Sequence, residues 1–246
     1  MHVENRYYIR PGVIEVEQVH TSMLGNHNSR NDGQGLTIEA VKRINTKRAA
    51  KQLRRIIDAN FEPGDWYITW TYKRGTNKSI EELEADLNKL LRLLKYRYRK
   101  RGHPLKWIAV VGVNAPHIHM ILNNMDEYNY SKELRKIWQG HIKMEPLYIE
   151  DGRYMQLAEY LVKHKAENEK KLGFSLKHKQ AYKKSRNLII PKKRRKIINE
   201  KEIIKAPKVP TGYMLDTNIQ MVSGISDYTG YRYRYFYLLK KIRKRE

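Results

Sequence analysis

Apolar residues recur every three or four positions over residues 80–100, which is the clearest periodic pattern in the chain. Such spacing places one apolar stripe along a helix, and the stripe consists of Leu83, Leu87, Leu90, Leu91, Leu94 and Tyr98. Ser79 and Glu82 form a capping-box pattern before it, and Gly102 and Pro104 are stop signals after it. The pattern predicts a helix here, and weaker stripes predict helices over 38–60, 131–139 and 153–170.

Runs of β-branched and aromatic residues lie between these helices and predict strands. The strands are expected over 66–73, 106–113, 117–123 and 142–148. Only three residues connect the second strand to the third, so we expect these two to form an antiparallel hairpin. At the N-terminus, two extended pieces are expected around the turn Pro11-Gly12, followed by a loop of turn-forming residues over 21–36.

The order of these elements predicts an α+β fold, in which two helices pack on an antiparallel β-sheet. We expect N-terminal strands and a loop over 1–36, a main domain over 37–172, and a C-terminal part over 173–246. The last part begins with a basic segment and continues through a linker marked by prolines. It ends in a β-hairpin over 212–239, which we expect to pack on or near the main domain.

Composition gives the first indication of function. The 246 residues include 50 Lys and Arg against 26 Asp and Glu, a formal net charge of +24. This excess favours a polyanionic partner, with nucleic acid first and an anionic membrane surface second. Three basic clusters are expected to contact DNA phosphates, although each could also be an ordinary solvated surface: Arg48, Lys51, Arg54 and Arg55; Arg97, Arg99, Lys100 and Arg101; and Lys193, Arg194 and Arg195.

Several classes of protein are excluded by what the sequence lacks. There is no cysteine, so disulfide scaffolds, thiolate metal sites and thiol chemistry are ruled out. No apolar run approaches the length of a membrane span, and the first residues do not resemble a secretory signal. We therefore expect a cytoplasmic protein with no membrane partner. No phosphate-binding Gly-rich loop ending in Gly-Lys-Ser/Thr occurs, so a fused helicase motor is not expected.

Two histidines separated by one residue are the first candidates for chemistry. His117 and His119 lie in a predicted strand, where alternate side chains share a face, so both imidazoles point the same way. Two imidazoles at this spacing can hold one divalent metal ion. The alternative is a pair of surface histidines on a half-exposed strand.

The predicted helix over 153–170 carries a second group of polar residues. At 100° per residue, Tyr160 and Lys163 fall on the face opposite the apolar stripe, with Gln156 and His164 beside them. One helix therefore presents a tyrosine, a lysine and two potential ligands together. By itself this pattern is also that of an amphipathic helix with a solvated face.

Together with the strand Ile68-Thr-Trp-Thr-Tyr72, these segments resemble the motifs of the HUH endonuclease superfamily, and most of all its one-tyrosine rolling-circle replication initiators. That family has an apolar-Thr-x-Thr-aromatic strand, then His-hydrophobic-His, then Tyr-x-x-Lys on a helix. The order and spacing here are similar. The chain as a whole resembles replication-associated proteins of small phages and mobile elements of Gram-positive bacteria.

The resemblance implies a split βαβ sandwich that nicks and rejoins single-stranded or hairpin origin DNA. It implies Tyr160 as the nucleophile that forms a 5′-phosphotyrosine link, and Lys163 as a support for the developing charge. It also implies Mg²⁺ or Mn²⁺ held by His117 and His119, with a host helicase and polymerase as partners in a bacterial cytoplasm.

One departure concerns the third metal ligand, which many members of the family carry as a carboxylate on the strand before the histidine pair. The segment 107–113 has no carboxylate. Gln156 and His164, each one turn from Tyr160, are the substitutes. We favour Gln156 slightly and keep His164 as the alternative.

Two other functions fit the same residues. A relaxase or a single-tyrosine transposase would use the same chemistry in conjugative transfer or transposition. A non-catalytic, basic nucleic-acid-binding protein would make the histidine pair incidental. Covalent trapping of a single-stranded oligonucleotide separates the enzymes from the binding protein, because only a nucleophile leaves an adduct.

Overall fold

The computed structural model describes residues 1–21, 37–125, 130–149, 153–176, 180–226 and 230–241. The chain divides into two compact units. We call Val41–Ile189 the central unit, and Met1–Ala40 together with Ile190–Glu246 the terminal unit. The predicted boundaries at 36/37 and 172/173 stay a prediction.

A five-stranded sheet forms the middle of the central unit. Its strands are β3 (Trp66–Thr71), β4 (Trp107–Gly112), β5 (His117–Leu122), β6 (His141–Pro146) and the short β7 (Lys183–Lys184). Their order is β6-β3-β5-β4-β7, and every pairing is antiparallel. The predicted hairpin of β4 and β5 is confirmed, so the two histidines lie on the middle strand of the sheet.

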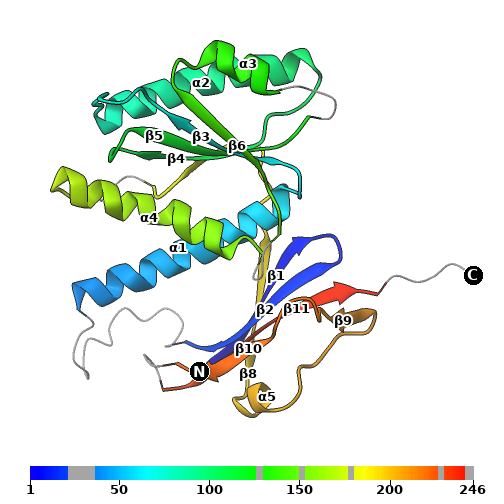
Figure 1. The fold of residues 1–246 in the computed structure, drawn as a ribbon. Coiled ribbons are helices and arrows are strands. Elements are labelled where there is room, and N and C mark those ends of the chain that lie inside the picture. Colours follow the sequence, from blue (N-terminus) through cyan, green and yellow to red (C-terminus); the bar gives the residue numbers. More distant parts are fainter. Residues whose placement is uncertain (22–36, 126–129, 150–152, 177–179, 227–229, 242–246) are drawn as a thin grey trace, which may run out of the picture. The chain divides into compact units, whose positions relative to one another are not determined.

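Helices cover both faces of this sheet (Figure 1). On one face lie α2 (Ile80–Lys100) and α3 (Tyr130–Ile137); on the other lie α4 (Met155–Leu172) and most of α1 (Ile38–Asn60). The predicted α+β class is therefore confirmed, although the sequence indicated two helices on the sheet rather than two on each face. Two separate hydrophobic clusters, one on each face, hold these layers together.

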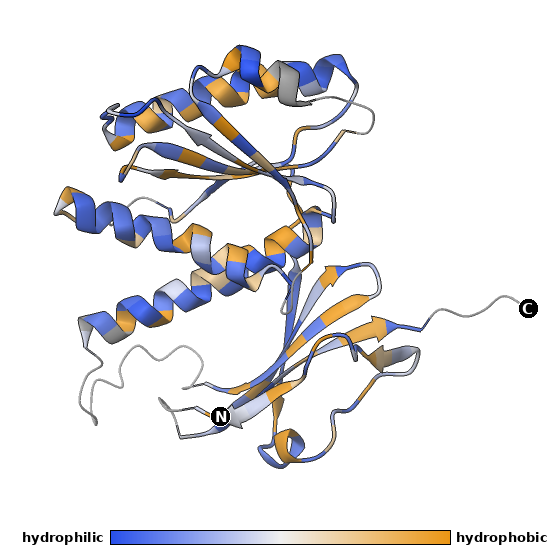
Figure 2. Cartoon of the chain, in the orientation of Figure 1, coloured by the Kyte–Doolittle hydropathy of each residue, from blue (hydrophilic) through white to orange (hydrophobic). Residues whose placement is uncertain are grey.

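The leucine stripe of α2 is buried as the periodicity predicts. Leu83, Leu87, Leu90 and Leu94 are all buried, and each such burial contributes about 1.5–3 kcal/mol. The capping box is present: the Ser79 hydroxyl accepts from the Glu82 amide at 3.2 Å, and the Glu82 carboxylate accepts from the Ser79 amide at 2.8 Å. Figure 2 shows the hydrophilic residues of α2 and α4 on their outer sides.

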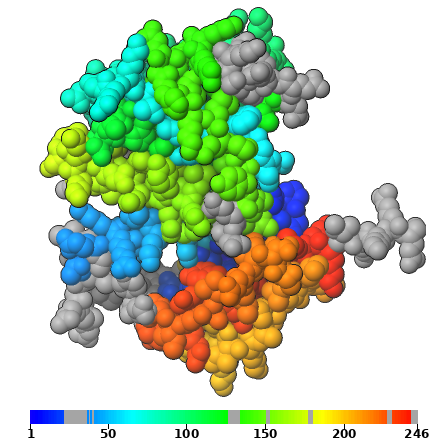
Figure 3. All heavy atoms as spheres, in the orientation of Figure 1, coloured from blue at the N-terminus to red at the C-terminus, as the bar shows by residue number. Residues whose placement is uncertain are grey.

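The terminal unit brings the two ends of the chain into one six-stranded sheet. It contains β1 (His2–Arg10), β2 (Val13–His20), β8 (Lys192–Ile198), β9 (Tyr213–Leu215), β10 (Val222–Ile225), β11 (Arg232–Lys240) and the short helix α5 (Lys201–Ile204). The strand order is β10-β11-β2-β1-β8, with β9 beside β11. The N-terminal and C-terminal atoms, blue and red in Figure 3, accordingly meet where the Lys240 amide donates to the Gly12 carbonyl at 2.8 Å.

This sheet joins segments that the sequence analysis kept apart. Both the N-terminal strand pair and the C-terminal hairpin of β10 and β11 form as predicted, but β11 pairs with β2. The basic segment that begins the C-terminal part forms β8, an edge strand on β1. Most of the predicted loop 21–36 and the tip of the C-terminal hairpin lie outside the described residues. None of the helices in the described ranges combines the length and hydropathy of a membrane span.

Candidate metal and nucleophile site

The candidate site begins with the two histidines of β5. Their shared strand face is confirmed, because Ile118, Met120 and Leu122 point into the cluster on the α2 side while His119 contacts residues on the α4 side. His119 is buried at 4% exposure, whereas His117 is half-buried near the end of the strand. Their ring centroids are 4.6 Å apart.

Helix α4 adds a third imidazole. Ala158, Leu161 and Val162 pack into the cluster between α1, α4 and the sheet, and this places His164 against the strand histidines. The His164 ring lies 5.1 Å from that of His117 and 4.8 Å from that of His119. One ligand atom from each of the three histidines lies within 4.8 Å of the others. The three together could hold a metal ion.

The hydrogen bonds of the three rings leave the same nitrogen available on each. His117 Nδ1 lies 2.7 Å from the Ala115 carbonyl oxygen, and His164 Nδ1 lies 3.3 Å from a Glu167 carboxylate oxygen. His119 Nδ1 lies 2.7 Å from the Tyr67 hydroxyl and 3.0 Å from that of Thr69. Metal-binding histidines show this arrangement, because an acceptor at one ring nitrogen orients the other toward the ion.

Two of the Nε2 atoms are orphaned. Those of His117 and His164 are buried and have no hydrogen-bond partner within the described part of the chain. Buried polar atoms without a partner are rare, because desolvation without a compensating bond costs about 1–3 kcal/mol. A metal ion would supply the missing partner, so the donor set fits one.

Burial keeps these imidazoles neutral, which is the form that binds a metal. Desolvation, followed by the charges of His117 and His164, lowers the pKa of His119 from 6.5 to about 3. Desolvation and His117 lower the pKa of His164 to about 4, against a smaller opposing effect of Glu167. Both rings are therefore ready to bind an ion at neutral pH without first losing a proton.

The lowered pKa values predict a pH-dependent stability of the metal-free protein. In the unfolded chain these histidines take up protons as the pH falls through 6.5, whereas in the folded protein they do so only near 4 and 3. The unfolded state binds more protons in between, so the free energy of unfolding should decrease as the pH falls from about 7 to about 5. Urea denaturation followed by circular dichroism measures this slope.

The control is the double variant His119→Gln, His164→Gln, which keeps polar side chains of similar length but cannot titrate there. Its slope between pH 7 and 5 should be clearly shallower than that of the unchanged protein. Equal slopes would contradict the neutral, buried state of the two imidazoles.

Tyr160 lies one turn before His164, and its hydroxyl is 3.0 Å from His119 Nε2. The residue is 47% exposed and faces a pocket of about 450 Å³. Partial burial, and then the charge of Glu167, raise the pKa of Tyr160 above its usual value. The pocket gives a ligand access to the hydroxyl; its lining includes Tyr67, Thr69, Lys143, Tyr148 and Gln156.

The remaining predicted residues of α4 take different places. Lys163 is exposed and forms an ion pair with Glu167 at 3.4 Å, the carboxylate that also contacts His164. Gln156, the favoured third ligand, lines the pocket beside Tyr160, while the alternative His164 joins the histidine group. Glu167 therefore links the predicted lysine to the metal-binding imidazole.

Two buried contacts anchor α4, and the sequence analysis found neither. At the start of the helix, Arg153 pairs with Asp58 of α1 at 3.2 Å. In the fourth turn, the Asn168 side chain donates to the Val111 carbonyl at 2.8 Å and accepts from the Val113 amide at 3.0 Å. These bonds tie the helix that carries Tyr160 and His164 to the strand beside His117 and His119. A polar residue within a helical pattern gives no sign of such a distant partner.

Gly112 was also missed, although it makes room for a site residue. It pairs with His117 across β4 and β5, and a Cβ atom placed on it would lie only 2.2 Å from Cε1 and 2.5 Å from Nε2 of that ring. Such distances are far inside van der Waals contact. The imidazole therefore packs directly over the glycine backbone, and any larger side chain there would displace it.

Gly112→Ala should accordingly impair the site more than the fold. We expect metal affinity to fall by roughly ten- to a hundredfold, the scale seen when a residue that orients a metal ligand is lost. Calorimetric titration with Mn²⁺ measures it, with circular dichroism to check folding. Gly75→Ala is the control, because a Cβ on Gly75 meets nothing within 4 Å. An unchanged Mn²⁺ affinity in Gly112→Ala would show that the ring tolerates displacement.

The predicted DNA-contacting clusters are partly corrected by their burial. Arg54 and Arg55 were expected on the exposed face of α1 but are buried at 4% and 8% exposure. They follow and precede the apolar residues Leu53 and Ile56, so they flank the buried stripe rather than lying opposite it. The other members are exposed or half-buried: Arg48, Lys51, Arg97, Arg99, Lys100, Arg101, Lys193, Arg194 and Arg195.

Comparison with known proteins adds one match. Residues 65–165 match the family model described as replication-associated protein ORF2. Comparison with curated proteins and with solved structures gives no match. The matched segment covers less than half of the chain but contains His117, His119, Tyr160 and His164. Over this segment the chain is similar to the replication-associated proteins of that family, which supports a Rep-like replication initiator.

Proposed function

We propose that the protein is a one-tyrosine HUH endonuclease that nicks and rejoins single-stranded DNA to initiate rolling-circle replication of a phage or plasmid-like element. The observation that carries the proposal is the pair of orphaned histidine Nε2 atoms in a group that also contacts the Tyr160 hydroxyl. A metal-binding imidazole group beside an accessible tyrosine fits phosphodiester transfer to that tyrosine. The match to replication-associated proteins supports the replicative role.

Tyr160 is the nucleophile in this proposal. Its oxygen attacks the scissile phosphorus, the bond from phosphorus to the 3′ oxygen breaks, and a 5′-phosphotyrosine link forms. The phenol loses a proton and the leaving 3′ oxygen gains one, so the step is balanced. Rejoining is the reverse attack by a 3′-OH and needs no nucleotide cofactor, because the phosphotyrosine bond conserves the energy of the broken one.

The three imidazoles are the proposed ligands, with His164 in place of Gln156 as the third. A divalent ion held there would polarise the scissile phosphate as a Lewis acid. Of the two ions expected, Mn²⁺ suits three nitrogen donors better than Mg²⁺, which prefers oxygen. Lys163 assists by approaching the developing charge; its exposed pair with Glu167 is worth only about 0–1 kcal/mol and is easily exchanged.

The exposed basic residues are proposed to hold the origin DNA on either side of the reaction. Phosphate contacts of this kind give affinity and salt dependence but little sequence information. The chemistry is assigned to the predicted domain 37–172, and a host helicase and polymerase in the bacterial cytoplasm would separate and copy the strands.

Covalent trapping tests the proposal directly. The protein is incubated with a 5′- or 3′-labelled single-stranded oligonucleotide from its own replicon, with Mn²⁺ or with a chelator. The expected result is an adduct that survives denaturing electrophoresis, carries the 3′ part of the oligonucleotide, and needs the ion. A relaxase or transposase would form the adduct on transfer or transposon-end sequences instead. Metal-independent binding without an adduct would contradict an enzyme altogether.

A further inference from the structure

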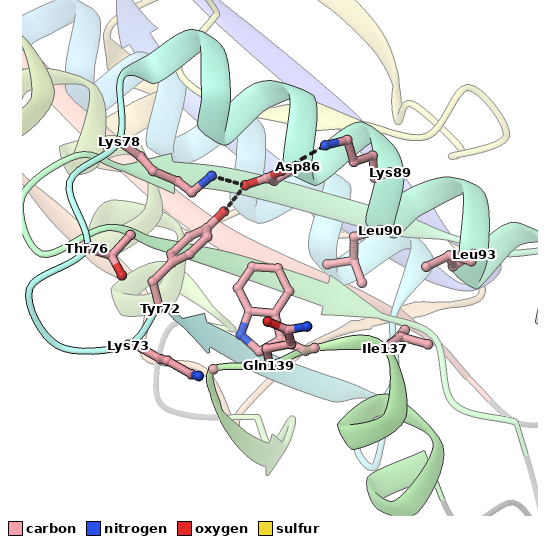
Figure 4. A pocket seen from close by; sticks show the side chains of 12 residues that line it. Tyr72, Lys73, Thr76, Lys78, Asp86, Lys89, Leu90, Leu93, Ile137 and Gln139 are labelled. Atoms are coloured by element: carbon pink, nitrogen blue, oxygen red, sulfur yellow. Dashed lines mark hydrogen bonds and ion pairs between the residues drawn. The ribbon is translucent and has the colours of Figure 1, made fainter.

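A second pocket, of about 470 Å³, opens on the face of the central sheet that α2 and α3 cover (Figure 4). It begins at Tyr72, directly after β3, and extends along α2. Its volume is in the range of small-ligand sites. We call it the lysine–aromatic pocket, and its lining is Tyr72, Lys73, Thr76, Lys78, Asp86, Lys89, Leu90, Leu93, Ile137, Trp138, Gln139 and Gly140.

Two aromatic rings are held rigidly in this pocket. The rings of Tyr72 and Trp138 meet edge to face, with centroids 4.8 Å apart. The Tyr72 hydroxyl donates to Asp86 at 2.9 Å, and the Trp138 indole donates to the Thr71 carbonyl at 3.0 Å. A Cβ on Gly140 would lie 1.8 Å from that same carbonyl oxygen, so the chain passes there as closely as its backbone allows. The aromatic surface is thus built in advance of any ligand.

The charged residues around these rings leave an excess of positive charge. Asp86 accepts from Lys78 at 2.7 Å and from Lys89 at 3.5 Å, so its carboxylate is already matched (Figure 4). Lys73 is exposed and forms no ion pair with any described residue. Three ammonium groups thus stand against one carboxylate. An apolar floor that includes the 44%-exposed Leu93 lies between them.

We propose that the lysine–aromatic pocket binds one unpaired nucleotide of the DNA strand. Aromatic and apolar surfaces accept the face of any base, and lysines at the rim accept its phosphate. This inference rests on the proposed function for the identity of the ligand as single-stranded DNA. It adds a separate binding site to that function, because no residue of the pocket belongs to the histidine and tyrosine site.

The pocket and the metal site lie at the same end of the sheet. Thr71 pairs with His117 in the register of β3 and β5, and the Tyr72 amide donates to the Pro116 carbonyl at 3.4 Å. Alternation along β3 sends Thr69 toward His119 and sends Trp70 and Tyr72 toward α2. A strand with its scissile phosphate at Tyr160 can therefore turn around this end of the sheet. The bound nucleotide would lie a few positions from the nick.

Substitutions at the rim of the pocket test the proposal without disturbing the anchored rings. Leu93→Glu puts a negative charge on the exposed floor, and Tyr96→Glu puts the same charge on an exposed residue of α2 that does not line the pocket. Lys73→Gln removes the unpaired ammonium group. Each is made in the Tyr160→Phe background, so that fluorescence anisotropy with a labelled oligonucleotide measures binding without cleavage.

Leu93→Glu should weaken binding roughly five- to a hundredfold, the effect of losing one stacked base. Lys73→Gln should weaken it about two- to tenfold and reduce its salt dependence, whereas Tyr96→Glu should stay within about twofold. An oligonucleotide with 5-iododeoxyuridine at successive positions should crosslink to Tyr72 or Trp138 from one position near the nick. Equal binding by Leu93→Glu and Tyr96→Glu, or crosslinks to neither ring, would overturn the proposal.

These outcomes are independent of the nicking chemistry. If the unchanged protein forms the covalent adduct but Leu93→Glu binds DNA normally, only the pocket assignment fails. If the pocket variants weaken binding but no adduct ever forms, the pocket stands and the proposed endonuclease activity fails.

Discussion

Tyr160→Phe is expected to abolish the covalent DNA adduct while leaving DNA binding within about twofold of the unchanged protein. The substitution removes the hydroxyl that attacks phosphorus and one hydrogen bond to His119, and it keeps the ring in the pocket. Loss of a covalent nucleophile costs roughly 10⁴- to 10⁶-fold in rate. Adduct formation on denaturing gels measures the loss, and anisotropy with the same oligonucleotide measures binding.

Tyr67→Phe is the matched control, because the Tyr67 hydroxyl also contacts His119 but lies on the Nδ1 side, at 2.7 Å. It should still form the adduct, at a lower rate, since it only helps to orient the imidazole. Tyr154, another tyrosine near the start of α4, is buried at 2% exposure and offers no access to DNA. If Tyr160→Phe kept its adduct, the assignment would move to Tyr148, which is 65% exposed and lines the same pocket.

Replacing His164 should have the second largest effect. His164→Ala removes one of three imidazoles and should lower Mn²⁺ affinity by at least about a hundredfold, since losing even a residue behind a ligand costs ten- to a hundredfold. Adduct formation at limiting Mn²⁺ should fall in parallel and recover in part when the ion is raised. Calorimetric titration of Mn²⁺ into the Tyr160→Phe background measures the affinity without turnover.

Two further variants make this test specific. His119→Ala should also lose both metal affinity and adduct, because it removes the most buried of the three rings. Gln156→Ala should bind Mn²⁺ within about twofold of the unchanged protein, since Gln156 lines the pocket without belonging to the histidine group. The reverse pattern, with Gln156→Ala impaired and His164→Ala intact, would restore Gln156 as the third ligand.

Local patterns along the chain were sufficient to predict most helices and strands. The 3.6-residue stripe of α2, its capping box, and the alternation of β4 and β5 depend on neighbouring residues, so they are visible before folding. Helical periodicity placed Tyr160 and Lys163 on the exposed side of α4, and strand alternation placed His117 and His119 on one face. These relations need no knowledge of what packs against the element.

Relations between distant segments were not visible in the same way. The pairing of β11 with β2, the burial of Arg54 and Arg55, and the bonds of Asn168 to β4 depend on which elements become neighbours. Helical periodicity placed Gln156 and His164 equally close to Tyr160, because both are one turn away. Which of the two meets the strand histidines depends on how α4 lies on the sheet.

By itself, the sequence determined the elements, the α+β class, the positive charge and the set of residues able to bind a metal or attack a phosphate. Only the tertiary structure decided that His164 completes the histidine group, that Gly112 leaves room for His117, and that Tyr72 and Trp138 form one wall of a pocket. The physical reason is the range of the interactions. Side-chain periodicity and caps act over a few residues, whereas ligand geometry and burial depend on packing between segments that lie far apart along the chain.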